Sequence, residues 1–214
     1  MRIVLVRHGE TPWNVEGRYQ GRTYDIGLSE RGKAQARALG ERLQEMAWAR
    51  VVSSPLRRAR ETAEILVAGA SAELWLDADL EEISHGLWEG RLATEVQAQW
   101  SEVLHRWRTR PDQVRLPGGE TLEEVQVRAW RSLERHAEGM GEDDALLVVT
   151  HDGVCRVLLA RILGLPLGRV WSFRQAPTAL NLLEGPSLET LAVLRLNDAA
   201  HVAPLFGEPI HRRL

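Results

Sequence analysis

The sequence predicts an α/β fold, a three-layer α/β/α sandwich with a mainly parallel central sheet and a small helical cap insertion. Short apolar runs rich in β-branched residues alternate with stretches of helical periodicity, as in βαβ units. The two strongest runs, "IVLV" and "ALLVVT", show no polar alternation, which is typical of strands covered on both faces. A length of 214 residues with 44% apolar residues suits one sizeable core. We therefore expect a single domain over residues 1–214, with the cap at about residues 93–117.

The first part of the chain supplies three expected strands and two helices. The opening apolar run predicts a buried strand over 3–6. Ser29 can cap a helix that runs to about Trp48, with its apolar residues near one face. A second strand follows over 50–54, and Pro55 suits the first turn of a helix that continues to about Val67. The run "AELWLDADL" indicates a third strand that leads into a loop.

The remainder continues the alternation. Helical stretches are expected at about 93–106 and 121–138, and "PGGE" separates them. The run over 145–150 predicts a second strongly buried strand, followed by a helix over 154–163. Near the C-terminus, "TALNLLE" and "TLAVLRL" are typical of an edge hairpin or sheet pair.

Composition excludes several classes of partner. A net charge of −3 favours neither nucleic acid nor an anionic membrane surface. No apolar run approaches the roughly 20 residues that span a bilayer, and the first residues lack the apolar region of a signal peptide. The single cysteine, Cys155, cannot form an internal disulfide, which fits a reducing compartment. We expect a cytoplasmic protein without a nucleic-acid or membrane partner.

Three of the expected strands end in reactive or anion-binding residues. The first ends in Arg7 and His8, the second leads to Arg57, and the strand over 145–150 is followed by His151. Because ligand sites of open parallel sheets lie at the carboxyl ends of the strands, we expect these two histidines and two arginines to converge on one pocket. A helix N-terminus there would add backbone N–H donors.

A pocket of this composition suits a phosphate dianion. Arginine forks bind phosphate oxygens bidentately, and an imidazole can accept a phosphoryl group. A proton donor for the leaving alkoxide is also needed, and Glu82 in "LEEISHG" is the candidate. A general acid needs a raised pKa, whereas neighbouring arginines push the pKa of a carboxyl down. The sequence leaves this conflict open.

A zinc site is the alternative for the two histidines. Catalytic zinc usually has three protein ligands, commonly with two close in the sequence, and adjacent arginines would repel a cation. His8 and His151 show neither spacing nor surroundings of that kind. We therefore expect no metal.

These motifs, in this order, resemble the histidine phosphatase superfamily, in the branch named for cofactor-dependent phosphoglycerate mutase. The matching segments are "LVRHGETPWN", "GRYQG", "LSERGKAQARALG", "VVSSPLRRARETAE", "EISHGLWEG", "LPGGETLEEVQVR" and "VVTHDGV". The resemblance implies that His8 is the nucleophile that becomes phosphohistidine. It further implies phosphoryl contacts by Arg7, Arg57, His151 and Asn14, substrate or phosphate contacts by Gln20 and Gly21, and proton transfer by Glu82.

The resemblance leaves three functions open. Mutases of this branch carry a longer insertion after the acid residue, whereas the shorter stretch here, with "PGGET", is similar to the phosphatase members. We therefore expect a phosphomonoesterase acting on small phosphorylated metabolites, without metal or cofactor, as a monomer or homodimer. The alternatives are a cofactor-dependent phosphoglycerate mutase and a non-catalytic phospho-ligand-binding regulator. One departure is Asp152, where many relatives carry a small residue, and we expect it to point away from the phosphate or to contact a substrate hydroxyl.

Overall fold

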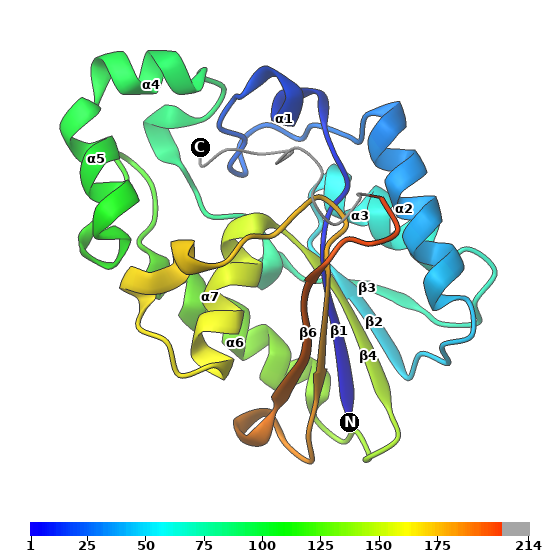
Figure 1. Ribbon diagram of the computed structural model, residues 1–214. Coiled ribbons are helices and arrows are strands. Elements are labelled where there is room, and N and C mark those ends of the chain that lie inside the picture. The colour runs from blue at the N-terminus through cyan, green and yellow to red at the C-terminus, as the bar shows by residue number, and fades with distance from the viewer. Residues whose placement is uncertain (203–214) are drawn as a thin grey trace.

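A central six-stranded sheet organises the computed structural model, which describes residues 1–202. Its order is β3-β2-β4-β1-β5-β6. The strands are β1 (Arg2–Arg7), β2 (Arg50–Ser53), β3 (Leu74–Leu76), β4 (Ala145–Thr150), β5 (Leu180–Glu184) and β6 (Ala192–Asp198). β3, β2, β4 and β1 pair in parallel, whereas β5 and β6 are antiparallel to their neighbours. The mainly parallel sheet and the antiparallel pair near the C-terminus are thus confirmed (Figure 1).

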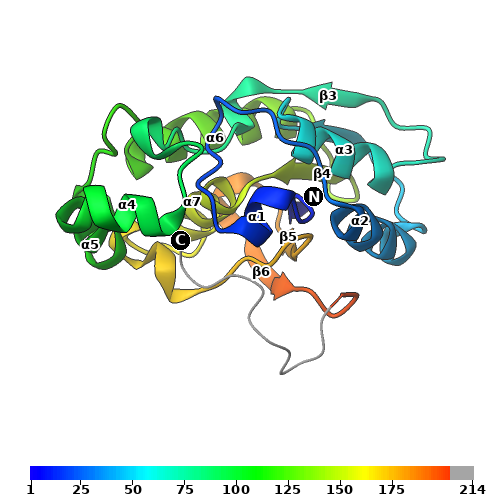
Figure 2. The same ribbon diagram turned by 90° about the horizontal axis from the view of Figure 1, so that it is seen from above.

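Helices cover both faces of this sheet. The α-helices are α1 (Pro12–Glu16), α2 (Glu30–Leu43), α3 (Arg57–Leu66), α4 (Ala93–Gln99), α5 (Ser101–Thr109), α6 (Leu122–Ala137) and α7 (Asp152–Ile162). The 3₁₀ turns are η1 (Ala78–Leu80), η2 (Gly86–Trp88), η3 (Pro111–Gln113), η4 (Leu167–Ser172) and η5 (Leu188–Thr190). α2 and α3 lie on one face and α6 and α7 on the other, while α4 and α5 lie at one side (Figures 1 and 2). No helix within residues 1–202 is both long and apolar enough to cross a bilayer.

The apolar run of β1 explains why the sheet is covered on both faces. Ile3 and Leu5 belong to the cluster that includes the apolar residues of α6 and α7, and Val4 and Val6 belong to the cluster of α2 and α3. Since side chains alternate across a strand, each face of the sheet needs its own apolar partner layer. All four side chains are almost completely buried. The three-layer sandwich follows from this.

Several helix boundaries differ from those expected. α2 ends at Leu43, earlier than predicted, and α3 begins at Arg57, so that Pro55 precedes the helix instead of entering its first turn. The helix expected over 93–106 is broken at Trp100, whose φ of −133° and ψ of 41° are not helical. α7 begins at Asp152, two residues earlier than expected, because the residue before it already acts as the N-cap.

Candidate active site

The two histidines of the strand ends lie together. β1 and β4 are neighbours in parallel register, with Arg7 opposite Thr150. His8 and His151 follow these residues and meet at the carboxyl edge of the sheet, where their ring centroids are 5.2 Å apart and the ring planes cross at 63°. Both side chains are buried. The structure thus brings together the histidines that the sequence placed at two strand ends.

The hydrogen bonding of His8 defines its tautomer. Its Nδ1 lies 2.6 Å from the carbonyl oxygen of Gly9. Because a carbonyl oxygen only accepts, Nδ1 carries a proton, and in the neutral imidazole Nε2 then carries the lone pair. Gly9 itself must be glycine, since a Cβ there would lie 2.7 Å from the carbonyl oxygen of Gly32 in α2. The close approach of α2 to this turn therefore helps to fix the carbonyl group that orients the His8 ring.

His151 is held as a neutral imidazole. Its Nε2 lies 2.8 Å from Ser54 Oγ at the end of β2. The pKa of His151 is well below its ordinary value, chiefly because the ring is buried and secondly because Arg58 is nearby. Its Nδ1 is buried and has no hydrogen-bond partner among residues 1–202. An anion bound beside the ring would supply a partner and favour the protonated form.

The expected role of Arg57 in the pocket is contradicted by its position. Arg57 is the first residue of α3, and its side chain is 56% exposed. Its Nε donates to Glu61 Oε1 over 2.6 Å, one turn further along the helix. Successive residues of a helix point about 100° apart, so Arg57 faces solvent while the next residue faces the sheet.

Arg58 occupies the place that was predicted for Arg57. Its side chain is fully buried, and its Nη2 donates to the carbonyl oxygen of Gly21 over 2.7 Å. Burial lowers the pKa of Arg58 to about 10, which leaves the guanidinium charged at neutral pH. Its Nε and Nη1 are buried without a hydrogen-bond partner in the described residues. A buried cation with unused donors is expected to bind an anion.

The sequence contains a signal for this second arginine. The buried residues of α3 are Arg58, Ala59, Thr62, Ala63 and Leu66. Their spacing is that of one helix face, and it includes Arg58 but excludes Arg57. The helix phase, read from the alanines and Leu66, could therefore have identified the correct arginine.

Arg7 is the other buried arginine of the site. Its Nη1 donates to the carbonyl oxygen of Gln175 over 2.5 Å and lies 3.6 Å from Asp152 Oδ1. Asp152 Oδ2 accepts a hydrogen bond of 2.9 Å from Nε of Arg156, one turn further along α7. Asp152 thus lies at the site and is engaged by two arginines, which reduces its repulsion of a bound anion.

Glu82 lies in the loop between η1 and η2 and is buried. Its Oε1 accepts from the backbone N–H of Ile83 over 2.9 Å, and its Oε2 is 3.4 Å from that of Gly153. Burial raises the pKa of Glu82, and the charge of Asp152 adds to this, whereas Arg58 opposes it. The conflict noted from the sequence is thus resolved in favour of a raised pKa, as a proton donor requires.

The three remaining predicted contacts lie in the segment after β1. Asn14 Oδ1 accepts from the backbone N–H of Thr11 over 3.0 Å, as part of the capping box of α1. Gln20 Oε1 is 3.0 Å from Thr11 Oγ1. Gly21 has a φ of 58° and offers its carbonyl oxygen to Arg58. Gly21 thus contacts Arg58 of the site, whereas Asn14 and Gln20 both contact Thr11.

The site combines two histidines with hydrogen-bond donors from side chains and backbone. Residues 1–202 contain no group of three or more His, Cys, Asp or Glu side chains arranged to hold a metal ion. The donors gathered around the two histidines are instead guanidinium and backbone N–H groups. His151 is the N-cap of α7, so the first N–H groups of that helix lie beside it.

Curated relatives cover most of the chain. Phosphoserine phosphatase 1 of Hydrogenobacter thermophilus is 33% identical over 208 residues, which is 97% of this chain and 97% of that protein. The protein named "Probable phosphoglycerate mutase GpmB" of Erwinia tasmaniensis is 34% identical over 169 residues, with 78% of this chain and 76% of that protein covered. Both names belong to phosphoryl-transfer enzymes.

A solved structure and a family comparison agree with these relatives. The structure of a mycobacterial glucosyl-3-phosphoglycerate phosphatase in complex with VO3 aligns with a TM-score of 0.83 and 30% identity, over 92% of this chain and 98% of that one. The histidine phosphatase superfamily (branch 1) matches residues 3–199. With its fold, its strand-end histidines and these matches, the chain belongs to the histidine phosphatase superfamily, branch 1.

Proposed function

We propose that this phosphatase is a metal-independent phosphomonoesterase that acts through a phosphohistidine on His8. The observation that carries the proposal is that two groups lie near His151: His8, with a proton on Nδ1, and the buried guanidinium of Arg58, with two nitrogen atoms unpartnered among residues 1–202. A phosphate dianion satisfies both features, because its oxygens accept from the guanidinium while its phosphorus faces the imidazole.

The first step transfers the phosphoryl group to the protein. Arg7, Arg58 and His151 hold the equatorial oxygens, whose negative charge is spread in the transition state. His8 Nε2 attacks phosphorus, the N–P bond forms, and the bond from phosphorus to the ester oxygen breaks. Glu82 donates its proton to that oxygen, so the leaving group departs as a neutral alcohol. The raised pKa of Glu82 keeps this proton available nearer to neutral pH.

The second step returns the protein to its starting state. Water enters the position that the alcohol has left, and the ionised Glu82 takes a proton from it. The water oxygen attacks phosphorus, the N–P bond breaks, and inorganic phosphate forms. His8 Nε2 regains its lone pair while Gly9 continues to hold the proton on Nδ1. One carboxyl group therefore serves both half-reactions.

Phosphomonoesters of small metabolites are the proposed substrates. The names of two relatives specify phosphoserine and glucosyl-3-phosphoglycerate, both phosphomonoesters of small hydroxylated compounds. We place the segment 93–117 as a cap, since its helices α4 and α5 flank the edge of the sheet that carries the site (Figure 1). We further propose a cytoplasmic monomer or homodimer without a nucleic-acid partner, in line with the net charge of −3 and the single cysteine.

A phosphoglycerate mutase is the second candidate, and the GpmB relative favours it. A mutase uses the same phosphohistidine, but it passes the phosphoryl group to another substrate hydroxyl and excludes water. The short stretch between Glu82 and His151 favours the phosphatase, since it leaves less chain to close over the site. A non-catalytic phospho-ligand-binding regulator is the third possibility.

Turnover of p-nitrophenyl phosphate in the presence of EDTA tests the proposal. We expect release of nitrophenol and an acid-labile phosphoenzyme that is absent in His8→Ala. Loss of activity in EDTA would contradict metal independence, and phosphate binding without turnover would favour the regulator. A panel with phosphoserine, other phosphorylated metabolites, and 3-phosphoglycerate plus bisphosphoglycerate separates phosphatase from mutase activity.

A further inference from the structure

The loop that carries Glu82 is held by an arginine from another layer of the molecule. Glu82 lies between η1 and η2, outside any strand or α-helix that would fix its backbone. Arg128 of α6 reaches this loop, and its side chain is only 12% exposed. Its Nη1 donates to the carbonyl oxygens of Asp79 over 2.8 Å and Glu81 over 2.6 Å. Its Nη2 donates to the carbonyl oxygen of Glu82 itself over 3.1 Å.

The same guanidinium is oriented by a carboxylate. Glu120 accepts from Nε of Arg128 over 3.0 Å and from its Nη2 over 3.1 Å, in a bidentate pair. Glu120 Oε2 also accepts from the backbone N–H of Ser84 over 2.8 Å, on the other side of Glu82. The guanidinium has five N–H groups, and five acceptors surround it. Arg128 and Glu120 therefore hold the backbone on both sides of Glu82.

A fourth carbonyl connects this arrangement to the histidines. Thr150 Oγ1 donates to the carbonyl oxygen of Leu80 over 2.7 Å, and Thr150 directly precedes His151. Arg128 and Thr150 thus donate a hydrogen bond to the carbonyl oxygen of each residue from 79 to 82. Between them, these contacts fix the distance from the carboxyl group of Glu82 to the phosphate-binding residues at the ends of β1 and β4.

We propose that Arg128, oriented by Glu120, is a positioning residue for proton transfer by Glu82. The inference rests on the proposed function, in which Glu82 protonates the leaving alcohol. A displacement of about 1 Å at a catalytic group lowers a rate by about 100-fold. Loss of Arg128 should therefore act on the step that needs the proton and leave phosphate binding by Arg7, Arg58 and His151 intact.

The test compares two substrates in Arg128→Met. We expect kcat/KM for an alkyl phosphate to fall by about 10- to 100-fold, because its leaving group needs the proton. For p-nitrophenyl phosphate, an activated aryl ester, the fall should be below about 3-fold. Inhibition by inorganic phosphate should not change. Equal falls for both substrates, or none, would overturn the role of Arg128.

Arg131→Met is the matched control. Arg131 lies on the same helix and pairs with the carboxylate of Asp79, but its side chain is 60% exposed, and among residues 1–202 its side-chain hydrogen bonds go to that carboxylate alone. We expect it to leave the ratio of the two kcat/KM values at the wild-type level. A change in that ratio equal to the change in Arg128→Met would show that any loss on this face of α6 has the same effect, and would overturn the inference.

Two more variants separate the possible failures. If Arg128→Met does not fold, Glu120→Gln is the deciding variant, because it weakens the orientation of Arg128 without removing the guanidinium. A smaller change in the ratio of the two kcat/KM values supports the inference. An unchanged ratio overturns it. Glu82→Gln is measured alongside. If Glu82→Gln changes the ratio and Arg128→Met does not, the positioning role falls while the proposed function stands. If Glu82→Gln leaves the ratio unchanged, the proton-donor assignment itself is wrong.

Discussion

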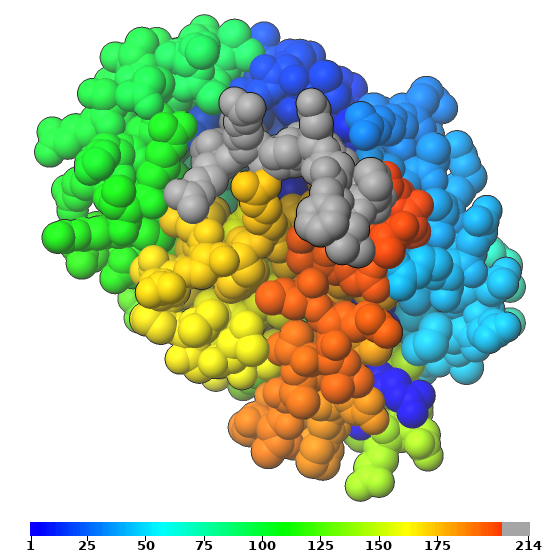
Figure 3. Space-filling model, viewed as in Figure 1, coloured from blue at the N-terminus to red at the C-terminus, as the bar shows by residue number. Residues whose placement is uncertain are grey.

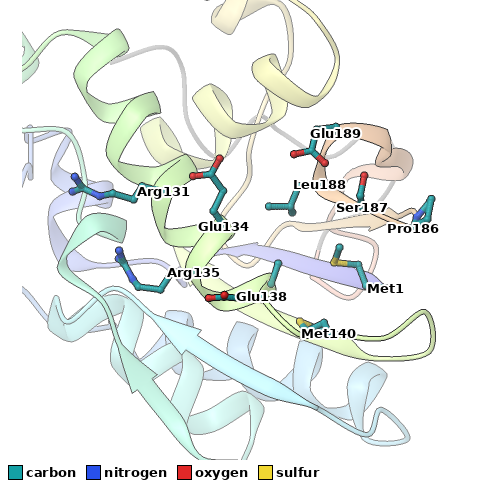
Figure 4. Close-up of a pocket in the computed structure, with 11 residues that line it drawn as sticks. Met1, Arg131, Glu134, Arg135, Glu138, Met140, Pro186, Ser187, Leu188 and Glu189 are labelled. Atoms are coloured by element: carbon teal, nitrogen blue, oxygen red, sulfur yellow. The ribbon is translucent and has the colours of Figure 1, made fainter.

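Charged side chains gather at both ends of the sheet, and the two gatherings differ in how their charges are paired. At the carboxyl ends of β1 and β4 lie Arg7, His8, Arg58 and His151, which we term the phosphate cluster. At the opposite end, where Met1 precedes β1, a groove of about 610 Å³ lies between α6 and residues 186–189 (Figure 4). We term it the amino-end groove. Figure 3 shows one face of the molecule, where β6 and the turn before it (orange) lie beside the segment after α7 (yellow), with α4 and α5 (green) at one side.

The cations at the amino-end groove have carboxylate partners. Arg131 donates to both oxygens of Asp79, over 3.0 and 2.6 Å, and Arg135 donates to Asp77 and Asp79, each over 2.8 Å. In the phosphate cluster, by contrast, Arg58 has two buried nitrogen atoms without a partner among residues 1–202. Buried charge in need of a counter-ion, more than hollow volume, therefore distinguishes an anion site from a surface groove.

Replacement of His8 should produce the largest effect at the phosphate cluster. His8→Ala removes the proposed nucleophile, so we expect kcat for p-nitrophenyl phosphate to fall by about 10⁴-fold or more. The melting temperature should change little by comparison, because the role proposed for the imidazole is chemical. Steady-state kinetics and thermal unfolding of the same preparation measure both. A variant that keeps a substantial fraction of the activity would show that His8 is not the nucleophile.

The adjacent arginines of α3 provide the second comparison. Arg58→Met removes the buried donor that we propose binds the transition-state charge, and we expect kcat/KM to fall by about 100- to 1000-fold. Arg57→Met changes an exposed side chain and should leave kcat/KM within about 2-fold of the wild type. Inhibition by inorganic phosphate should weaken only in Arg58→Met. The reverse ranking of the two variants would restore Arg57 to the site.

This pair of arginines also shows what the sequence could predict. The strands and their carboxyl-end histidines follow from local patterns, and the structure has both. The choice between Arg57 and Arg58 depends on which residues of the helix face the sheet. The expected start of the helix at Pro55 does not by itself show which of its first residues do so. The buried face that includes Thr62 and Leu66 fixes that phase.

The loop around Glu82 could not be predicted in the same way. Its carbonyl groups are bound by Arg128 and Thr150, both more than 40 residues away in the sequence. No periodic pattern indicates such long-range contacts to an irregular loop. The raised pKa of Glu82 also depends on burial, which only the packed structure provides. The motif indicates Glu82 as the candidate, but it does not indicate the pKa of its carboxyl group.

The protonation of Glu82 gives a prediction on stability. Because burial raises its pKa in the folded protein, protonation stabilises the fold below the ordinary pKa of a glutamate, and this contribution is lost as the pH rises through the raised value. Glu82→Gln cannot ionise. Its melting temperature should therefore rise relative to that of the wild type as the pH is raised from about 4 to about 8.

Glu124→Gln serves as the control with the opposite sign. The hydrogen bond from Arg115 lowers the pKa of Glu124, so the contribution of this carboxylate is present above its ordinary pKa and is lost as the pH falls. Glu124→Gln should thus lose stability relative to the wild type as the pH rises, by a small amount because the pair is exposed. A difference between Glu82→Gln and the wild type that does not vary with pH would contradict the raised pKa.

The smallest effect on activity is expected at the amino-end groove. Leu188 lines it and is only 8% exposed, so Leu188→Ala should lower the free energy of unfolding by about 2 kcal/mol through lost packing. Because the groove lies at the end of the sheet opposite the phosphate cluster, kcat/KM measured well below the melting temperature should stay at the wild-type value. A fall in kcat/KM without a fall in melting temperature would mean that the groove and the phosphate cluster are coupled. The contrast between paired and unpaired charge would then not suffice to separate a functional site from a structural surface in this molecule.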